Sequence, residues 1–191
     1  LINSLAVTYG NLGMAEKEEE YYNKGIRLAL SESSILGLNM VNSYAISLGN
    51  SGKIDKGADL LSEMVRRAET VYGTGSRYYV EVLANYADYL LLYKKDLKNS
   101  LEIYRRCEDY INNNPKDANL RDPVLLGYAQ ALFNYGEPQE ALGKLQELLF
   151  AGGNVTQDDF LINPSPDIIP ANQAFLNTLR LKYEILWDLY K

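Results

Sequence analysis

The sequence predicts an all-α protein in which about four antiparallel helix pairs stack into a right-handed superhelical solenoid, followed by a C-terminal capping helix. Two observations carry this prediction. Apolar residues recur at three- and four-residue spacing, which places them on one face of a helix. The same pattern then returns after 39 to 42 residues, a period typical of stacked helical pairs.

The clearest unit runs from Leu125 to Leu148. Gly136 and Pro138 separate its two apolar halves, because glycine commonly ends a helix and proline is tolerated in the first turn of the next. Ala129 and Ala141 are small enough for the two helices to approach closely. We therefore interpret this stretch as one helix–turn–helix unit.

Small residues and turn residues mark the other units at matching steps. The first helices carry an alanine, in order Ala6, Ala45, Ala87 and Ala129. The turns carry Gly13, Gly52, Lys94 in place of glycine, and Gly136. Five residues after each glycine, the second helix presents Glu18, Gly57 or Ala141; the third unit has one extra turn residue, which puts its equivalent position at Ser100.

These residues resemble the tetratricopeptide repeat (TPR) family, whose units combine a Leu-Gly/Ala-x-x-Tyr/Leu segment with later Gly, Ala and aromatic positions. The long step and the openings INSLA, VNSYA and LANYA are similar to the kinesin-light-chain type of repeat. Asn3 and Asn42 match the first asparagine of that type's Leu-Asn-Asn-Leu-Ala opening, and Asn85 matches the second. The resemblance implies a TPR-like fold and a role in protein–protein interaction.

The repeats predict four hairpins within residues 1–150, at about 1–32, 33–73, 76–114 and 121–151. A loop over 151–169 and a helix over 170–191 should follow, the helix either capping the array or beginning a further repeat. The expected helices are 2–12, 15–30, 35–51, 54–72, 77–93, 97–112, 122–135, 138–150 and 171–190. Ser33 or Ser34 is the expected cap of the third helix.

Composition narrows the function classes. The net charge of -6 argues against nucleic acid as the main partner, because phosphate binding needs a basic face. No run of 18 apolar residues occurs, so we expect no membrane partner. One cysteine suits a reducing compartment, and we expect a cytoplasmic protein. Because the chain opens with Leu1 inside a helical pattern, we expect it to be a piece of a longer protein.

Catalysis is not expected within these residues. Histidine is absent, which removes the commonest general base and metal ligand. The sequence contains no phosphate-binding glycine loop. Cys107 falls at a packing position of the repeat, so we interpret it as a buried structural thiol. The run Glu16–Glu20 opens a helix, where carboxylates favour the positive end of the helix dipole. We therefore predict no enzyme activity, no cofactor and no metal.

The binding surface is expected on the first helices of the pairs, which line the concave side of such arrays. Asn11, Asn50 and Asn134 each stand two residues before a turn glycine, and a row of amides could hold a peptide backbone; the alternative is that they cap or solvate the helix ends. The predicted peptide-binding residues are Asn3, Asn11, Asn42, Asn50, Asn85, Asp88, Gln130, Phe133 and Asn134, with Val7, Ile46 and Leu92 also expected to be exposed on these helices.

The sixteen tyrosines are better explained by packing than by an aromatic cage. Six of them fall at packing positions of the repeat: Tyr9, Tyr22, Tyr44, Tyr86, Tyr104 and Tyr128. The pattern leaves Tyr78, Tyr79 and Tyr89 less well explained.

Two functions fit the sequence. The first is an interaction scaffold that binds a peptide or partner helix on the concave face, with self-association through the end helices as a further option. The second is the regulatory arm of a larger enzyme, because long-period repeats followed by an isolated helix resemble the region before the caspase-like peptidase domain of bacterial repeat–peptidase fusions. In that case the catalytic residues would lie beyond Lys191.

Overall fold

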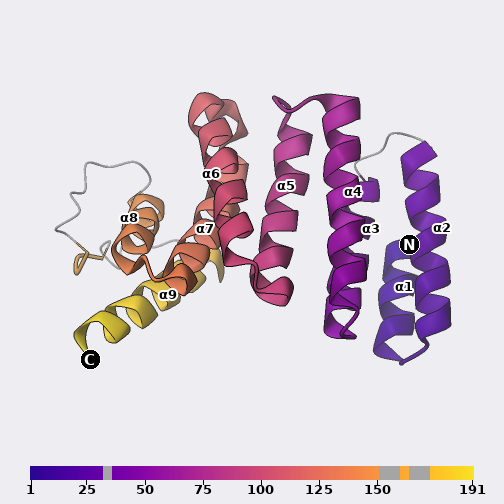
Figure 1. Ribbon diagram of the computed structural model, residues 1–191, viewed down its shortest axis with the longest axis horizontal. Helices are drawn as coiled ribbons and strands as arrows, with labels where there is room; N and C mark the ends of the chain where they lie inside the picture. Colours follow the sequence, from indigo (N-terminus) through magenta and orange to yellow (C-terminus); the bar gives the residue numbers. More distant parts are fainter. Residues whose placement is uncertain (32–35, 151–159, 164–172) are drawn as a thin grey trace. The chain divides into compact units, whose positions relative to one another are not determined.

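The described residues fold into helices that follow one another along the chain (Figure 1). The computed structural model describes residues 1–31, 36–150, 160–163 and 173–191, and none of these forms a β-strand. Contacts divide the chain into two compact units, Leu1–Asp96 and Leu97–Lys191. The boundary falls between the two helices of the predicted third pair.

The first unit consists of helices that each pack against the next one along the chain. Its elements are α1 (Ile2–Asn11), α2 (Ala15–Ser31), α3 (Leu36–Asn50), α4 (Ile54–Tyr72), α5 (Arg77–Tyr89) and a π-helical turn, η1 (Leu90–Lys94). Helix α3 also contacts both α1 and α5. The first helices of successive pairs are therefore neighbours, with their partners packed beside them.

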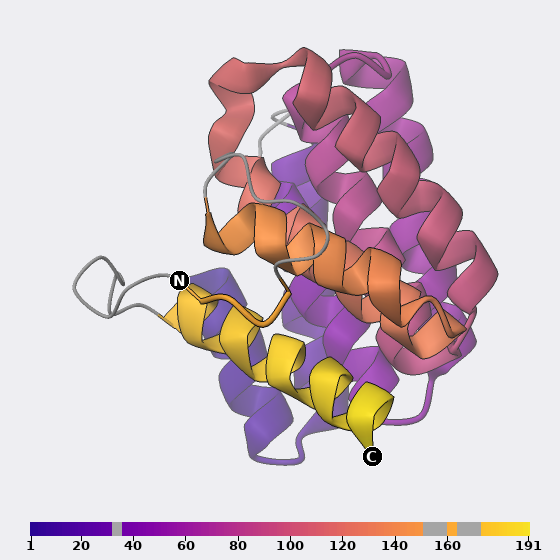
Figure 2. The ribbon, with the colours of Figure 1, turned by 90° about the vertical axis from the view of Figure 1, so that its left-hand side faces the viewer.

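The second unit begins with α6 (Leu97–Asn113) and a 3₁₀ helix, η2 (Pro115–Leu120), and continues with α7 (Arg121–Tyr135), α8 (Pro138–Leu149) and α9 (Gln173–Tyr190). Helix α9 lies beside α8 and also contacts α7 (Figure 2). Helix α3 contacts α2 and α1 in the same way, so α9 takes the place of a first helix. Whether it caps the array or begins a further repeat stays a prediction.

The helices agree with the sequence prediction to within a few residues at each end. Ser76 caps α5, because its Oγ accepts a hydrogen bond from the Tyr79 amide at 3.1 Å. The predicted cap at Ser33 or Ser34 lies outside the described residues, as does most of the predicted loop over 151–169.

One turn differs from the prediction. Lys94 was expected to replace the turn glycine, but the left-handed residue is Lys95, with φ +57°. The equivalent glycines, Gly13, Gly52 and Gly136, have φ between +71° and +95°. The reason is the π turn η1, which absorbs the extra residue before the chain reverses. Counted from Lys95, Ser100 stands five residues after its turn, as in the other units.

The close helix contacts form at the alanines that the repeat predicts. Ala6, Ala45, Ala87 and Ala129 are all fully buried. Around them, tyrosines pack against tyrosines: the ring centroids of Tyr22 and Tyr44 lie 4.7 Å apart, and those of Tyr104 and Tyr128 lie 6.0 Å apart. These four tyrosines are at most 5% exposed, which confirms the packing interpretation for them, whereas Tyr9 and Tyr86 are partly buried.

The structure also explains the tyrosines that the repeat pattern did not place. The Tyr89 hydroxyl donates to the Ile54 carbonyl oxygen at 3.0 Å and lies against Gly57, where a larger residue would meet it. Tyr79 is buried, and the Tyr78 ring lies 5.2 Å from that of Tyr72. Cys107 is fully buried, as its packing position predicts.

A buried lysine joins α9 to α8 and to the segment 160–163. The Lys182 ammonium donates to Gln146 Oε1 at 2.7 Å, the Ile162 carbonyl oxygen at 2.6 Å and Asn163 Oδ1 at 3.0 Å. We call these four residues the Lys182 cluster. All three acceptors are uncharged oxygens, and burial lowers the pKa of Lys182 from 10.5 to about 8. The sequence analysis did not anticipate this cluster.

Candidate functional site

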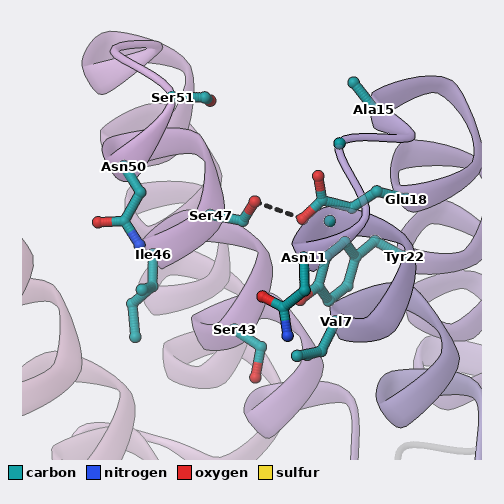
Figure 3. A pocket seen from close by; sticks show the side chains of 12 residues that line it. Val7, Asn11, Ala15, Glu18, Tyr22, Ser43, Ile46, Ser47, Asn50 and Ser51 are labelled. Atoms are coloured by element: carbon teal, nitrogen blue, oxygen red, sulfur yellow. Dashed lines mark hydrogen bonds between the residues drawn. The ribbon is translucent and has the colours of Figure 1, made fainter.

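A pocket of about 530 Å³ opens in the first unit between the α1–α2 hairpin and α3 (Figure 3). Its volume falls within the range of about 300 to 1,000 Å³ typical of ligand sites. The residues that line it are Val7, Gly10, Asn11, Gly13, Ala15, Glu18, Tyr22, Ser43, Ile46, Ser47, Asn50 and Ser51. Most come from the first helices α1 and α3 and the turns that follow them.

The pocket is open because Ser51 does not fill it. In the next helix pair, a tyrosine fills the equivalent place. The Tyr93 ring covers the bare backbone of Gly49, where an added Cβ would lie 2.5 Å from the ring. Tyr93 stands six residues after Ala87, and Ser51 stands six residues after Ala45. Because serine is too short to cross to the preceding hairpin, the space beside Ser51 stays open.

The amide of Asn50 is held in a fixed orientation at the edge of the pocket. The Tyr93 hydroxyl donates to Asn50 Oδ1 at 2.9 Å, which leaves the two N–H groups of Asn50 as donors. Ser43 and Ser51 instead donate their hydroxyl hydrogens to backbone carbonyls of α3, at 2.9 and 3.0 Å. Val7 and Ile46, each 40% exposed, supply the apolar surface between these polar groups.

One carboxylate lies in the pocket. Ser47 Oγ on α3 donates to Glu18 Oε1 on α2, which ties the hairpin to the next pair (Figure 3). The side chain of Glu18 reaches this position across Gly10, where an added Cβ would lie 2.5 Å from Oε1. Below it, burial, followed by the charge of Glu18 and by Tyr44, raises the pKa of Tyr22 to about 12. The Tyr22 hydroxyl therefore stays protonated at neutral pH.

An ion pair joins α2, next to the pocket residue Glu18 in sequence, to α4. Lys56 Nζ on α4 lies 2.8 Å from Glu19 Oε1, and this contact lowers the pKa of Glu19 and raises that of Lys56. The Tyr44 hydroxyl adjoins this pair and contributes to both shifts. Because Lys56 of α4 pairs with Glu19, it does not pair with Glu18, whose side chain lies in the pocket.

Of the nine predicted peptide-binding residues, the structure brings Asn11 and Asn50 together at the pocket, with the expected neighbours Val7 and Ile46. Asn3, Asn42, Asn85 and Asp88 are partly buried elsewhere on the first helices, and Asn3 Oδ1 is buried without a partner among the described residues. In the second unit, Gln130 Nε2 donates to Asn134 Oδ1 at 3.1 Å, and Phe133 is partly buried. A binding role for all nine stays a prediction.

The three asparagines before the turn glycines do not cap their helices. In the described part of the chain, the side chains of Asn11, Asn50 and Asn134 form no bond to the backbone of their turns. Asn50 instead pairs with Tyr93, and Asn134 pairs with Gln130. Asn11 is exposed at the pocket.

Sequence reasoning missed Glu18 as a pocket residue. Glu18 was interpreted as part of the run Glu16–Glu20 that opens a helix, although it occupies the position that Gly57, Ser100 and Ala141 hold in the other units. Those three residues are buried. A carboxylate at a position otherwise kept small was the signal that could have identified it.

Two other kinds of site were sought in the same residues. No group of three or more cysteine or carboxylate side chains in the described ranges is placed to hold a metal ion. Of the helices described, none combines the length and apolarity needed to cross a lipid bilayer.

Comparisons with known proteins identify the fold. No family model matches the chain, and no curated protein sequence does. Among solved structures, two crystal structures from Podosopora anserina, described as kinesin light chain nearly identical TPR-like repeats, match closely. One, a variant, has a TM-score of 0.69 at 12% identity and covers 98% of this chain and 85% of that chain. The second has a TM-score of 0.67 at 12% identity, with 98% and 86% covered.

The chain is therefore a TPR-like helical-repeat protein in its fold, as the sequence predicted. At 12% identity, the similarity shows the fold and does not identify a ligand for this chain. The predicted link to a caspase-like peptidase stays a prediction.

Proposed function

We propose that this chain is an interaction scaffold that binds an extended peptide or a partner helix along its first helices, with the pocket between α1 and α3 as one contact site. The observation that supports this most directly is the make-up of the pocket. Two amides, Asn11 and Asn50, stand at equivalent positions of successive repeats and flank the apolar side chains of Val7 and Ile46.

This arrangement suits a peptide main chain. A backbone offers alternating donors and acceptors, and an asparagine side chain can pair with either. Because Asn50 Oδ1 already accepts a hydrogen bond from the Tyr93 hydroxyl, the N–H groups of Asn50 are the ones that can donate to a peptide carbonyl. Apolar surface between polar groups then accepts a side chain of the bound segment.

The test starts from a phage library of random heptapeptides selected on the immobilised chain. Affinities of the selected peptides, made synthetically with a fluorophore, are then measured by fluorescence polarisation. Ser51→Tyr should fill the pocket in the way that Tyr93 fills the equivalent place, and should weaken binding by at least about ten-fold. Asn11→Ala should weaken it less, because it removes one hydrogen-bonding group.

Asn23→Ala is the matched control, since Asn23 is an exposed asparagine of α2 that does not line the pocket. Its affinity should stay within about two-fold of the unaltered chain. Thermal melting by circular dichroism checks that each variant is folded. Selected peptides that bind Ser51→Tyr as tightly as the unaltered chain would show that the pocket is not the binding site.

A further inference from the structure

The pocket carries a charge that the repeat does not require. Glu18 stands at the position where the other units place the small, buried residues Gly57, Ser100 and Ala141. Instead of packing between helices, the longer side chain extends across Gly10 into the pocket. A substitution of this kind places a carboxylate in a partly enclosed site between two repeats.

Within the described residues, one oxygen of this carboxylate accepts a hydrogen bond and the other does not. Ser47 Oγ donates to Oε1 of Glu18, and no described residue bonds to Oε2. The Ser47 bond fixes the orientation of the carboxylate, and the absence of a Cβ on Gly10 permits it. The second oxygen is therefore held ready for an external donor.

The charge of Glu18 is not balanced within the pocket. The residues that line it include no lysine or arginine. Two nearby lysines are engaged elsewhere in the described structure: the Lys17 ammonium lies 5.2 Å from the centre of the Tyr9 ring, and Lys56 pairs with Glu19 at 2.8 Å. A ligand that brings a positive charge to Glu18 would supply the missing partner.

We propose that the pocket binds a lysine or arginine side chain of the peptide partner. The cationic group donates to Glu18 Oε2, a charge-assisted bond stronger than one between neutral groups. The aliphatic part of the same side chain packs on Val7 and Ile46. The amide of Asn50 donates to a carbonyl of the peptide main chain. This inference rests on the proposed function and defines the chemistry of the partner.

The experiment uses the peptides selected on the unaltered chain. Those whose binding Ser51→Tyr weakens should share a lysine or arginine. Glu18→Gln should weaken them by about ten-fold, because it removes the charge while its oxygen can still accept from Ser47. Glu20→Gln is the matched control: it makes the same change of charge at an exposed position of α2 outside the pocket, and should stay within about two-fold.

A second measurement needs no protein variant. Replacing the shared basic residue of the peptide by norleucine should weaken binding to the unaltered chain by about ten-fold, and should cause little further loss on Glu18→Gln. Non-additive losses of this kind identify the two groups as partners.

The outcomes separate the two proposals. One outcome overturns the charge inference while the proposed function stands: Ser51→Tyr weakens peptide binding, but the affected peptides lack a basic residue. The same conclusion follows if those peptides bind Glu18→Gln as tightly as the unaltered chain. If Ser51→Tyr has no effect, the pocket is not the binding site, and both the proposed contact site and the charge inference are overturned. If the library yields no binding peptide, the proposed peptide binding is overturned, and the inference with it.

Discussion

The Lys182 cluster makes the stability of the second unit depend on pH in a defined window. Burial lowers the pKa of Lys182 from 10.5 to about 8, whereas in the unfolded chain the ammonium is fully hydrated. The difference is worth about 3 kcal/mol between the two protonation states. We therefore expect the charged form of this lysine to cost the fold part of its stability at neutral pH.

The sign follows from which state holds the proton. Below pH 8 Lys182 is protonated in both states, and the cost is fully present. Between pH 8 and 10.5 the folded chain releases the proton while the unfolded chain keeps it, so the free energy of unfolding rises with pH. From pH 7.5 to 9.5 the expected gain is about 2 kcal/mol.

The upper limit of the window is set by tyrosines. Burial is the main cause of the raised pKa values of Tyr22, which reaches about 12, and of Tyr128. Above about pH 10 the unfolded chain ionises its tyrosines first, which lowers the stability of the fold. Measurements should therefore stay at or below pH 9.5.

The assay is urea unfolding at pH 7.5, 8.5 and 9.5, followed by far-ultraviolet circular dichroism and by the fluorescence of Trp187, the single tryptophan of the sequence, which lies on α9. The unaltered chain should gain stability across this range. Lys182→Met should show no such gain, because it removes the titrating group. The control Lys98→Met, at an exposed position of α6, should keep the slope of the unaltered chain. Parallel pH profiles for the unaltered chain and Lys182→Met would refute the reasoning.

Three further predictions test the packing. Gly57→Ala should lower the free energy of unfolding, measured in urea, by about 1 to 3 kcal/mol, because a Cβ there would meet the Tyr89 hydroxyl. Tyr89→Phe should restore part of this loss; equal losses with Tyr89 and with Tyr89→Phe would contradict the prediction. Lys95→Gly should stabilise the turn by up to about 1 kcal/mol, because glycine removes the strain of a positive φ. Gly52→Ala should destabilise its turn by about 1 kcal/mol for the converse reason. Urea unfolding of each variant measures both changes. Cys107 should react with Ellman's reagent only after unfolding in urea, because its thiol is fully buried, and rapid reaction of the folded chain would show that α6 opens readily.

The locally encoded features of the fold could be predicted from the sequence. Helix positions follow from apolar spacing, and turns follow from residues such as Gly13 and Gly136, because both depend on interactions within a few residues. The alanines of the first helices could be identified as close-contact positions because the repeat displays each of them in the same place. The TPR-like fold was predictable for this reason.

Local pattern was not sufficient at Lys95. The extra residue of the third unit is visible in the sequence, but the sequence does not say where the chain absorbs it. A π turn keeps the helix continuous, so the left-handed residue moves from Lys94 to Lys95. Tyr89, at the end of α5, and Tyr93, within η1, stack across this turn with ring centroids 4.8 Å apart.

The sequence by itself therefore determined the helices, the repeat and the class of surface on which binding is expected. Tertiary structure decided where that surface is open and what charge it carries. The pocket depends on Ser51 being short, on Gly10 lacking a side chain and on Glu18 reaching Ser47 across 29 residues of sequence. The Lys182 cluster likewise joins groups up to 36 residues apart. Such contacts arise only when distant segments fold together, because no periodicity within one helix specifies them.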